Sequence, residues 1–317
     1  MHGRTSTSIV VLIGGIVCGT AGVAVARFAP DASAVTVGAV RLAIGGPALA
    51  IIALAAGHRP SALAGHMRWI VAGALAVVLY QVCFFTGTSR TGVALATVVA
   101  LGSAPAISGV IDAVLLRRPP SRRWAIGTAL AIAGIALIVG SQPSAATDLI
   151  GIVSAIAAGA AWAVYALICQ RRIATGLDST VCMAGMFGVA AVLVVPALVM
   201  GDVSWVGTPD GAALAVYLGV ATIAVVYTCY GFGLRTLSPP TVLTLTLVEP
   251  LTAAVLATVV LDQHLDVRGW IGVAAVIVAL VITASAATAT RQPPTNAAMR
   301  RMPSSMSASA SANEKRA

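Results

Sequence analysis

The sequence predicts an all-α integral membrane protein in which ten helices cross the bilayer. Three observations lead to this class: ten long apolar runs lie between Ser8 and Ala286, only 9% of the 317 residues are charged, and basic residues concentrate in alternate gaps between the runs. Soluble domains carry about 25% charged residues. A hydrocarbon core about 30 Å thick needs a helix of about 20 apolar residues, so each run is long enough, or nearly so, to cross once.

The ten runs are separated by more polar segments. They lie at Ser8–Ala26, Ala32–Ala55, Trp69–Thr86, Thr91–Leu116, Trp124–Gly140, Asp148–Cys169, Thr180–Met200, Gly211–Leu234, Pro239–Leu261 and Trp270–Ala286. Within each run the apolar residues are continuous rather than alternating, which excludes a lipid-facing β-barrel. Three runs begin with tryptophan, whose ring is typical of the boundary between lipid and water.

Basic residues predict the orientation of these helices. If the N-terminus faces the cytoplasm, that side receives 15 of the 19 Lys and Arg residues, the opposite side receives 3, and one lies inside a span. The positive-inside rule favours this arrangement. We therefore expect a multi-pass protein of the cytoplasmic membrane with both termini in the cytoplasm. Because Arg4 closely precedes the first run, we expect that run to be retained rather than cleaved as a signal peptide.

Composition also argues against several other classes. The net charge of +9 is explained by loop arginines that meet anionic lipid headgroups, because they gather on one side and lack interleaved aromatic residues. Membrane lipid is therefore an expected partner, and nucleic acid is not. The five cysteines form no Cys-x-x-Cys pair and lie within or at the ends of runs. We expect them to be small apolar fillers, with no disulfide framework, metal site or cofactor.

The two halves of the chain resemble each other. A shift of 145 residues aligns Arg27 with Arg172, Arg90 with Arg235, Pro105 with Pro250, and Gly127 with Gly272. Each half holds five runs, and this odd number makes the second half enter the membrane from the opposite side. We therefore predict two inverted five-helix repeats, over residues 1–141 and 142–290. Residues 291–317 are rich in Ser, Ala and Pro and are expected to form a disordered cytoplasmic tail.

Charged side chains inside a span are the strongest functional candidates, because each costs about 2.5–3.5 kcal/mol at the bilayer centre. Glu249 lies near the middle of the ninth run and Pro250 follows it, so the helix can bend or open there. Thr246 lies one turn earlier on the same face. The sequence predicts a substrate contact or a proton-accepting carboxylate at Glu249. The alternative is a carboxylate buried for structural pairing.

Arg41, in the second run, is the basic counterpart of Glu249. Three roles are open to it: binding an anionic group of a solute, pairing with Glu249 across the bundle, or reaching outward to the lipid headgroups. Pro105 holds in the first half the place that Pro250 holds in the second, and we expect both prolines to act as hinges. Thr97 lies on the face of Pro105 and adds a polar, uncharged group.

Aromatic residues are scarce, at 5%, so those within the runs are conspicuous. Tyrosine and tryptophan combine apolar area with a hydrogen-bond donor, which suits a cavity for a small amphipathic ligand. The candidates for lining such a cavity are Tyr80 with Gln81, Trp162 with Tyr165, and Tyr227 with Tyr230. The alternative for each is a residue packed in the bundle and hydrogen-bonded to a neighbouring carbonyl.

Three short motifs are similar to those of a known family. They are Gly159-Ala-Ala-Trp162-Ala-Val-Tyr165, Glu249-Pro-Leu-Thr-Ala-Ala and Val40-Arg41-Leu42. In their order and spacing, the chain resembles the EamA-type carriers of the drug/metabolite transporter superfamily over nearly all of residues 8–286. The resemblance implies two inverted five-helix repeats around a shared cavity, and export, or sometimes uptake, of amino acids, other metabolites or drug-like compounds. Arg41, Trp162, Tyr165, Glu249 and Pro250 match the family's residues in its second, sixth and ninth helices.

The sequence therefore predicts a secondary active or facilitative transporter that exports a small organic solute by alternating access around a midplane cavity. Protons are a candidate coupling ion, because no phosphate-binding loop for ATP is present in the sequence. The alternative is a membrane-embedded enzyme acting on a lipid or isoprenoid, which needs paired carboxylates or a histidine near the membrane face. Asp112 and Glu249 lie at different depths in their runs, so we do not expect an enzyme. The oligomeric state is left open.

Overall fold

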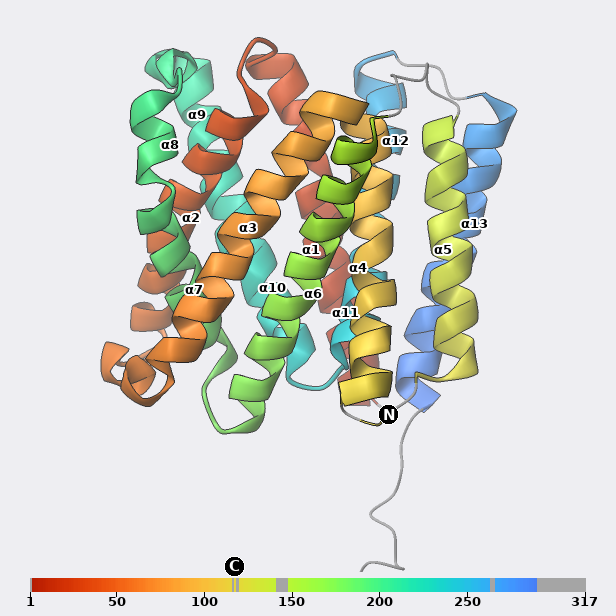
Figure 1. Cartoon of the computed structure of the whole chain (residues 1–317), viewed down its shortest axis with the longest axis horizontal. Coiled ribbons are helices and arrows are strands. Elements are labelled where there is room, and N and C mark those ends of the chain that lie inside the picture. The colour runs from red at the N-terminus through yellow and green to blue at the C-terminus, as the bar shows by residue number, and fades with distance from the viewer. Residues whose placement is uncertain (1, 116, 118–119, 141–147, 263–265, 290–317) are drawn as a thin grey trace, which may run out of the picture.

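The computed structural model describes residues 2–115, 117, 120–140, 148–262 and 266–289, and Figure 1 shows them as a bundle of helices that lie roughly side by side. Within these ranges the chain is helical apart from short turns, and no strand occurs. The predicted tail from residue 291 and the predicted boundary between the halves at residues 141–142 lie outside the described residues.

Ten helical stretches of the described chain are long and apolar enough to cross a membrane, which confirms the predicted fold class. In chain order the elements are α1 (His2–Phe28), α2 (Ala34–Ala55), η1 (Pro60–His66), α3 (Met67–Thr91), α4 (Val93–Leu115), α5 (Arg122–Gly140), α6 (Leu149–Ala174), α7 (Ser179–Leu193), α8 (Val195–Met200), η2 (Ser204–Gly207), α9 (Pro209–Gly219), η3 (Val220–Val225), α10 (Val226–Leu234), α11 (Pro239–Leu245), α12 (Val248–Val260) and α13 (Val267–Ala289). The start of α1 and the end of α13 lie at the same end of the bundle (Figure 1).

Three of these ten spans are interrupted along their length. α7 and α8 meet at Val194. α9 and α10 are joined by η3, which is a turn of π-helix. α11 and α12 are separated at Thr246 and Leu247. Pro250 has no N–H to give to the Thr246 carbonyl, so the helix opens at the place that the sequence predicted.

One predicted boundary is wrong. The sequence places Thr91 at the start of the fourth span, but Thr91 is the last residue of α3, and α4 begins at Val93. Between the two helices Gly92 adopts a φ of 82°, a left-handed conformation that favours glycine. Apolar residues continue across this tight turn, so hydropathy alone does not separate the two helices.

The main contacts between a helix of the first half and a helix of the second half have counterparts in which the two halves trade places. α3 packs along α6, and α10 packs along α1; likewise α4 lies against α6, and α12 lies against α1. α5 pairs with α13 and α2 pairs with α7, which are corresponding spans of the two halves. A two-fold axis in the membrane plane requires this set of pairs. The contacts therefore agree with an inverted repeat, and the inverted relation itself stays a prediction.

Polar contacts join the two halves at both ends of the bundle. At the end away from the termini, Arg90 forms an ion pair of 2.9 Å with Asp148, the N-cap residue of α6. The hydrogen bond from Arg90, followed by one from the Ile150 N–H, lowers the pKa of Asp148. Toward the opposite end, Nε1 of Trp124 on α5 donates to the Thr244 hydroxyl on α11 at 3.1 Å.

The variant Asp148→Asn loses the charge but keeps an oxygen that can cap α6. Because the pKa of Asp148 lies below its ordinary value of 3.8, the ion pair stabilises the fold at neutral pH, and this contribution is lost as the pH falls through the folded-state pKa. We expect the variant to unfold at a slightly lower temperature than the wild type at pH 7, and the two to converge once the pH lies below the folded-state pKa of Asp148. Thermal unfolding in one detergent measures both. A difference that does not change with pH contradicts this account.

Glycines let α1 lie close to its neighbours. A Cβ added at Gly19 would stand 2.5 Å from the carbonyl oxygen of Glu249 and 2.7 Å from Cβ of Thr252, both on α12. Gly22, three residues later on α1, has no heavy atom within 4 Å of an added Cβ. Small residues at such crossings are typical of helix interfaces within membranes. The α1–α12 distance at Glu249 therefore depends on Gly19.

The pair Gly19→Ala and Gly22→Ala tests this dependence with the same substitution on the same helix. We expect Gly19→Ala to lower the free energy of unfolding by about 1–3 kcal/mol, because the methyl group forces α1 and α12 apart. Gly22→Ala should leave stability unchanged or raise it slightly, since alanine favours helix. Unfolding of both variants in the same detergent provides the measurement. Equal stability of the two variants would mean that α1 is not held by this contact.

Candidate solute-binding site

Arg41 points from α2 into the bundle and is half-buried. Its Nη2 donates to the carbonyl oxygen of Thr222 at 3.3 Å and contacts Sγ of Cys18 at 3.7 Å. Thr222 lies in η3, where the π-helix interrupts the regular α-helical ladder, and such turns are frequent at functional sites. These contacts keep the guanidinium inside the bundle, so Arg41 does not reach outward to the headgroups.

Glu249 approaches Arg41 from the first turn of α12, directly after the break that ends α11, and it is also half-buried. The thiol of Cys18 interacts with both Glu249 and Arg41, so it stands between the two charges. Among the described residues, no nitrogen–oxygen contact of 4.0 Å or less joins Arg41 to Glu249. The two opposite charges therefore lie near each other without the direct ion pair that was one of the alternatives.

The predicted aromatic residues gather beside these charges. The rings of Tyr80 on α3 and Trp162 on α6 meet edge to face, with centroids 5.8 Å apart. Tyr165, one turn after Trp162, lies 6.0 Å from Tyr230 and 6.4 Å from Tyr227, which are both on α10. The structure thus brings together five aromatic residues that the sequence singled out separately. Offset and edge-to-face rings at these distances attract one another.

Two tyrosines connect this aromatic cluster to the charged pair. Tyr80 and Tyr227 lie within electrostatic range of both Arg41 and Glu249. Tyr227 also contacts Phe187 of α7, with ring centroids 4.1 Å apart. The sequence did not predict Phe187, because it is one more apolar residue in an apolar run and no local pattern sets it apart.

Several polar atoms in this region are buried with no hydrogen bond of ordinary geometry among the described residues, although Trp162 and the tyrosine hydroxyls lie close enough to interact with one another. They are Nε1 of Trp162, the hydroxyl oxygens of Tyr165 and Tyr230, and Nε of Arg41. A buried group that lacks its hydrogen bond costs about 1–3 kcal/mol. Because native proteins rarely leave such groups without good hydrogen bonds, these atoms are candidate contacts for water or a ligand. The atoms come from α2, α6 and α10, so they lie between both halves of the chain.

The remaining predicted residues lie around this region with different contacts. Gln81 donates to the Gly38 carbonyl at 3.3 Å and so ties α3 to α2. The buried hydroxyl of Thr246 donates to a carbonyl of its own helix at 2.9 Å, and Thr97 is half-buried on α4. α4 passes through Pro105 without a break, unlike the helix that contains Pro250. The roles of these residues in binding and hinge motion stay predictions.

Cys18 is a residue that sequence reasoning missed. The sequence suggested a small apolar filler; the side chain is buried as that reading expects, and its sulfur also lies between Arg41 and Glu249. Its neighbours give the one available sign: Gly15 and Gly19 bring α1 against α12, so a polar residue between them faces the centre of the bundle. In the described part of the chain, no group of three or more His, Cys, Asp or Glu residues is arranged to hold a metal ion.

The two halves differ in how tightly their fourth helices are covered. Beyond Leu251, no residue of α12 up to Val260 is buried on any face. The corresponding half of α4 keeps a buried stripe that includes Ser108 and Asp112. A helix exposed only to lipid retains one buried face. The second half of α12, which leads to the end of the bundle away from the termini (Figure 1), is therefore accessible from the bundle side as well.

Comparison with known proteins identifies the family of this chain. The EamA-like transporter family matches residues 5–140 and, a second time, residues 149–285. The chain belongs to this family. Each of the two matches covers five of the membrane-crossing helices, and together they make the protein a multi-pass membrane transporter.

Relatives of this EamA-like chain carry similar names. The "Uncharacterized transporter YwfM" of Bacillus subtilis is 32% identical over 281 residues, which cover 88% of this chain and 94% of that protein. An "Uncharacterized transporter" of Clostridium kluyveri is 33% identical over 140 residues, or 44% of this chain and 45% of that protein. A protein of known crystal structure shares the fold, with a TM-score of 0.76 at 19% identity, over 90% of this chain and 97% of that one. The family and the names of these relatives indicate a transporter.

Proposed function

We propose that this EamA-like protein is a secondary active or facilitative transporter that exports a small organic solute across the cytoplasmic membrane. The observation that carries the proposal is the meeting of Arg41, from the first half, with Glu249, from the second half, near the middle of their spans. A site shared by two halves is exposed to one side or the other when the halves move, which is the basis of alternating access.

The solute's chemistry follows from the groups that surround the site. Arg41 offers an unpaired donor to an anionic or carbonyl group, and Glu249 accepts from an ammonium or another donor. The aromatic cluster supplies flat apolar walls, with the buried hydroxyls of Tyr165 and Tyr230 directed among them. These features suit a small solute that carries polar groups of both kinds and an apolar part, such as an amino acid, another metabolite or a drug-like compound.

The burial pattern supports an outward-facing conformer. α11 lies between the site and the end of the bundle that holds the termini, and it is buried nearly all round. The solute's path from the site to that end is therefore closed. The second half of α12 is accessible instead, so the site is approached from the opposite end. In the alternate conformer, the corresponding half of α4 would open by the same movement. Protons are the proposed coupling ion, with Glu249 as the group that binds them.

Glu249→Gln tests the role of the carboxylate. A toxicity screen of overexpressing cells against amino acids, their analogues and drugs identifies a solute, and flux is then measured in liposomes. We expect the variant to lower flux roughly ten- to hundredfold, since a charged hydrogen bond is worth about 1.5–3 kcal/mol. The control Asp266→Asn, at an exposed position where the side-chain oxygen accepts from the Gly269 N–H, should transport normally. Unchanged flux in a correctly inserted Glu249→Gln removes this carboxylate from the mechanism.

The orientation is tested by labelling single cysteines from outside intact cells with a membrane-impermeant reagent. Ser121, before α5, lies at the end of the bundle that holds the termini, and Ser204, in η2, lies at the other end; both are exposed. We expect Ser204→Cys to react and Ser121→Cys to react only after the cells are permeabilised, with the unaltered chain as background. The reverse pattern would place both termini outside the cytoplasm.

A further inference from the structure

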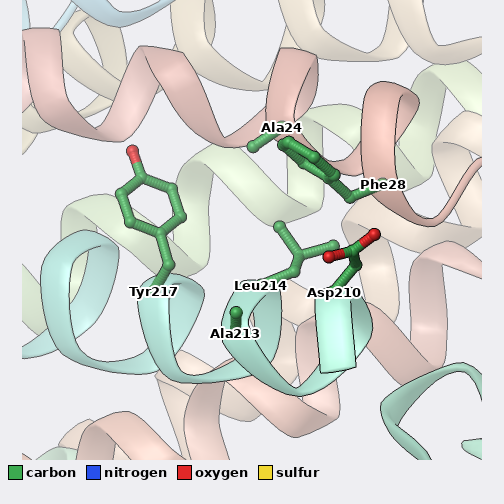
Figure 2. Close-up of a pocket in the computed structure, with 6 residues that line it drawn as sticks. All are labelled: Ala24, Phe28, Asp210, Ala213, Leu214 and Tyr217. Atoms are coloured by element: carbon green, nitrogen blue, oxygen red, sulfur yellow. The ribbon is translucent and has the colours of Figure 1, made fainter. Parts of the chain in front are cut away.

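A crevice separate from the charged site opens between α1 and α9. Its volume is about 400 Å³, and Figure 2 shows Ala24 and Phe28 of α1 facing side chains of α9 across it. The residues that line it are Ala24, Phe28, Asp210, Ala213, Leu214 and Tyr217. Because α1 ends at Phe28 and α9 begins at Pro209, the crevice lies at the end of the bundle away from the termini.

The crevice lies on the lipid side of α1. Thr20, Ala24 and Phe28 follow one another at a spacing of four residues and so share a face of the helix. Ile13 and Ile16 continue this face toward the middle of the membrane, and they expose 52% and 45% of their surface. Cys18 points to the bundle centre from a different face. A molecule in the crevice would therefore enter from the bilayer and not from the solute site.

The crevice is apolar inside and charged at its outer rim. Tyr217 closes the inner end, where its hydroxyl is hydrogen-bonded to the Thr20 hydroxyl. This hydroxyl therefore needs no hydrogen bond from a bound molecule. Asp210 lies at the other end, exposed, with no ion pair or hydrogen bond to another described residue. Figure 2 shows it rising from α9 on the side of the crevice opposite Phe28. Arg27 does not line the crevice but lies over the ring of Phe28, 5.9 Å from its centroid, so a cation adjoins one of the lining side chains.

We propose that this crevice binds a phospholipid whose headgroup ends in a primary amine. The ammonium donates hydrogen bonds to the Asp210 carboxylate, and the lipid phosphate pairs with Arg27. One acyl chain lies against Ala24, Leu214 and the Phe28 ring. A choline headgroup has the same net charge but no N–H to donate, so the carboxylate distinguishes phosphatidylethanolamine from phosphatidylcholine by hydrogen bonding and not by charge.

Three features of the crevice support a lipid over a soluble amine as the occupant. The opening lies on the exposed face of α1, Arg27 and Asp210 lie at the ends of α1 and α9 where a membrane-crossing helix meets the headgroups, and Arg27 contacts Phe28, which lines the crevice together with Asp210. A soluble amine uses the carboxylate alone and is repelled by Arg27, whereas a zwitterionic headgroup satisfies both charges. The proposal does not depend on which solute the protein carries, or on whether Glu249 takes part in transport.

The test uses the full chain in nanodiscs of phosphatidylcholine and phosphatidylethanolamine with identical acyl chains, and native mass spectrometry of the lipid that remains bound. We expect the wild type to retain phosphatidylethanolamine roughly three- to tenfold in excess of its share of the nanodisc, as an exposed charged hydrogen bond allows. Stepwise N-methylation of the headgroup should reduce retention in steps. Asp210→Asn and Arg27→Gln should lose the preference.

Matched controls lie at the same end of the bundle. Asp202→Asn changes an exposed carboxylate whose oxygen already accepts from the Ser204 N–H at 2.8 Å, and Arg268→Gln changes an exposed arginine in the first turn of α13. Both variants should keep the preference. Equal retention of the two lipids, or an undiminished preference in Asp210→Asn, overturns the proposal. So does octylamine binding that depends on Asp210 in nanodiscs where phosphatidylethanolamine shows no preference, because the crevice then takes a soluble amine.

Discussion

Placing an arginine and a glutamate inside a hydrocarbon layer constrains everything around them. Each charge costs several kcal/mol unless the protein supplies partners, and the partners here come from distant parts of the chain. Arg41 obtains a backbone carbonyl from η3, and Cys18 stands between it and Glu249. For these contacts to form, α1 must lie within a few ångströms of α12, which Gly19 permits. The two charges therefore depend together on the glycines of the first span, on the π-helix and on the break before Glu249.

The sequence predicted the features that depend on local energetics. Transfer of apolar residues into lipid is nearly additive along a run, so the ten spans and their order could be read directly. The intramembrane charges stand out for the same reason, since each is an exception in an apolar run. The turn at Gly92 was missed, because hydropathy is unchanged across it and a single φ angle makes the boundary.

Other features depend on how helices are rotated against each other, which a single sequence does not encode locally. In the first span only the neighbouring glycines hint at Cys18, and its place between two charges appears only when α1, α2 and α12 are assembled. The aromatic residues could be named singly, yet their meeting needs the rotation of α6 and α10. The equivalence of Pro105 and Pro250 was visible in sequence, but only one of them coincides with a break, because the two halves lie in different surroundings.

The π-helical turn of η3 has a consequence for how the eighth span is built. A π turn holds one residue more than an α turn, and one residue corresponds to about 100° of rotation around the axis. Every side chain after η3 is therefore turned by that angle from where an unbroken helix would present it. Tyr227 and Tyr230 face Tyr165 because of this added residue. A chain shortened by one residue within Val220–Val225 would still be long enough to cross the membrane, yet it would aim both hydroxyls at a different neighbour.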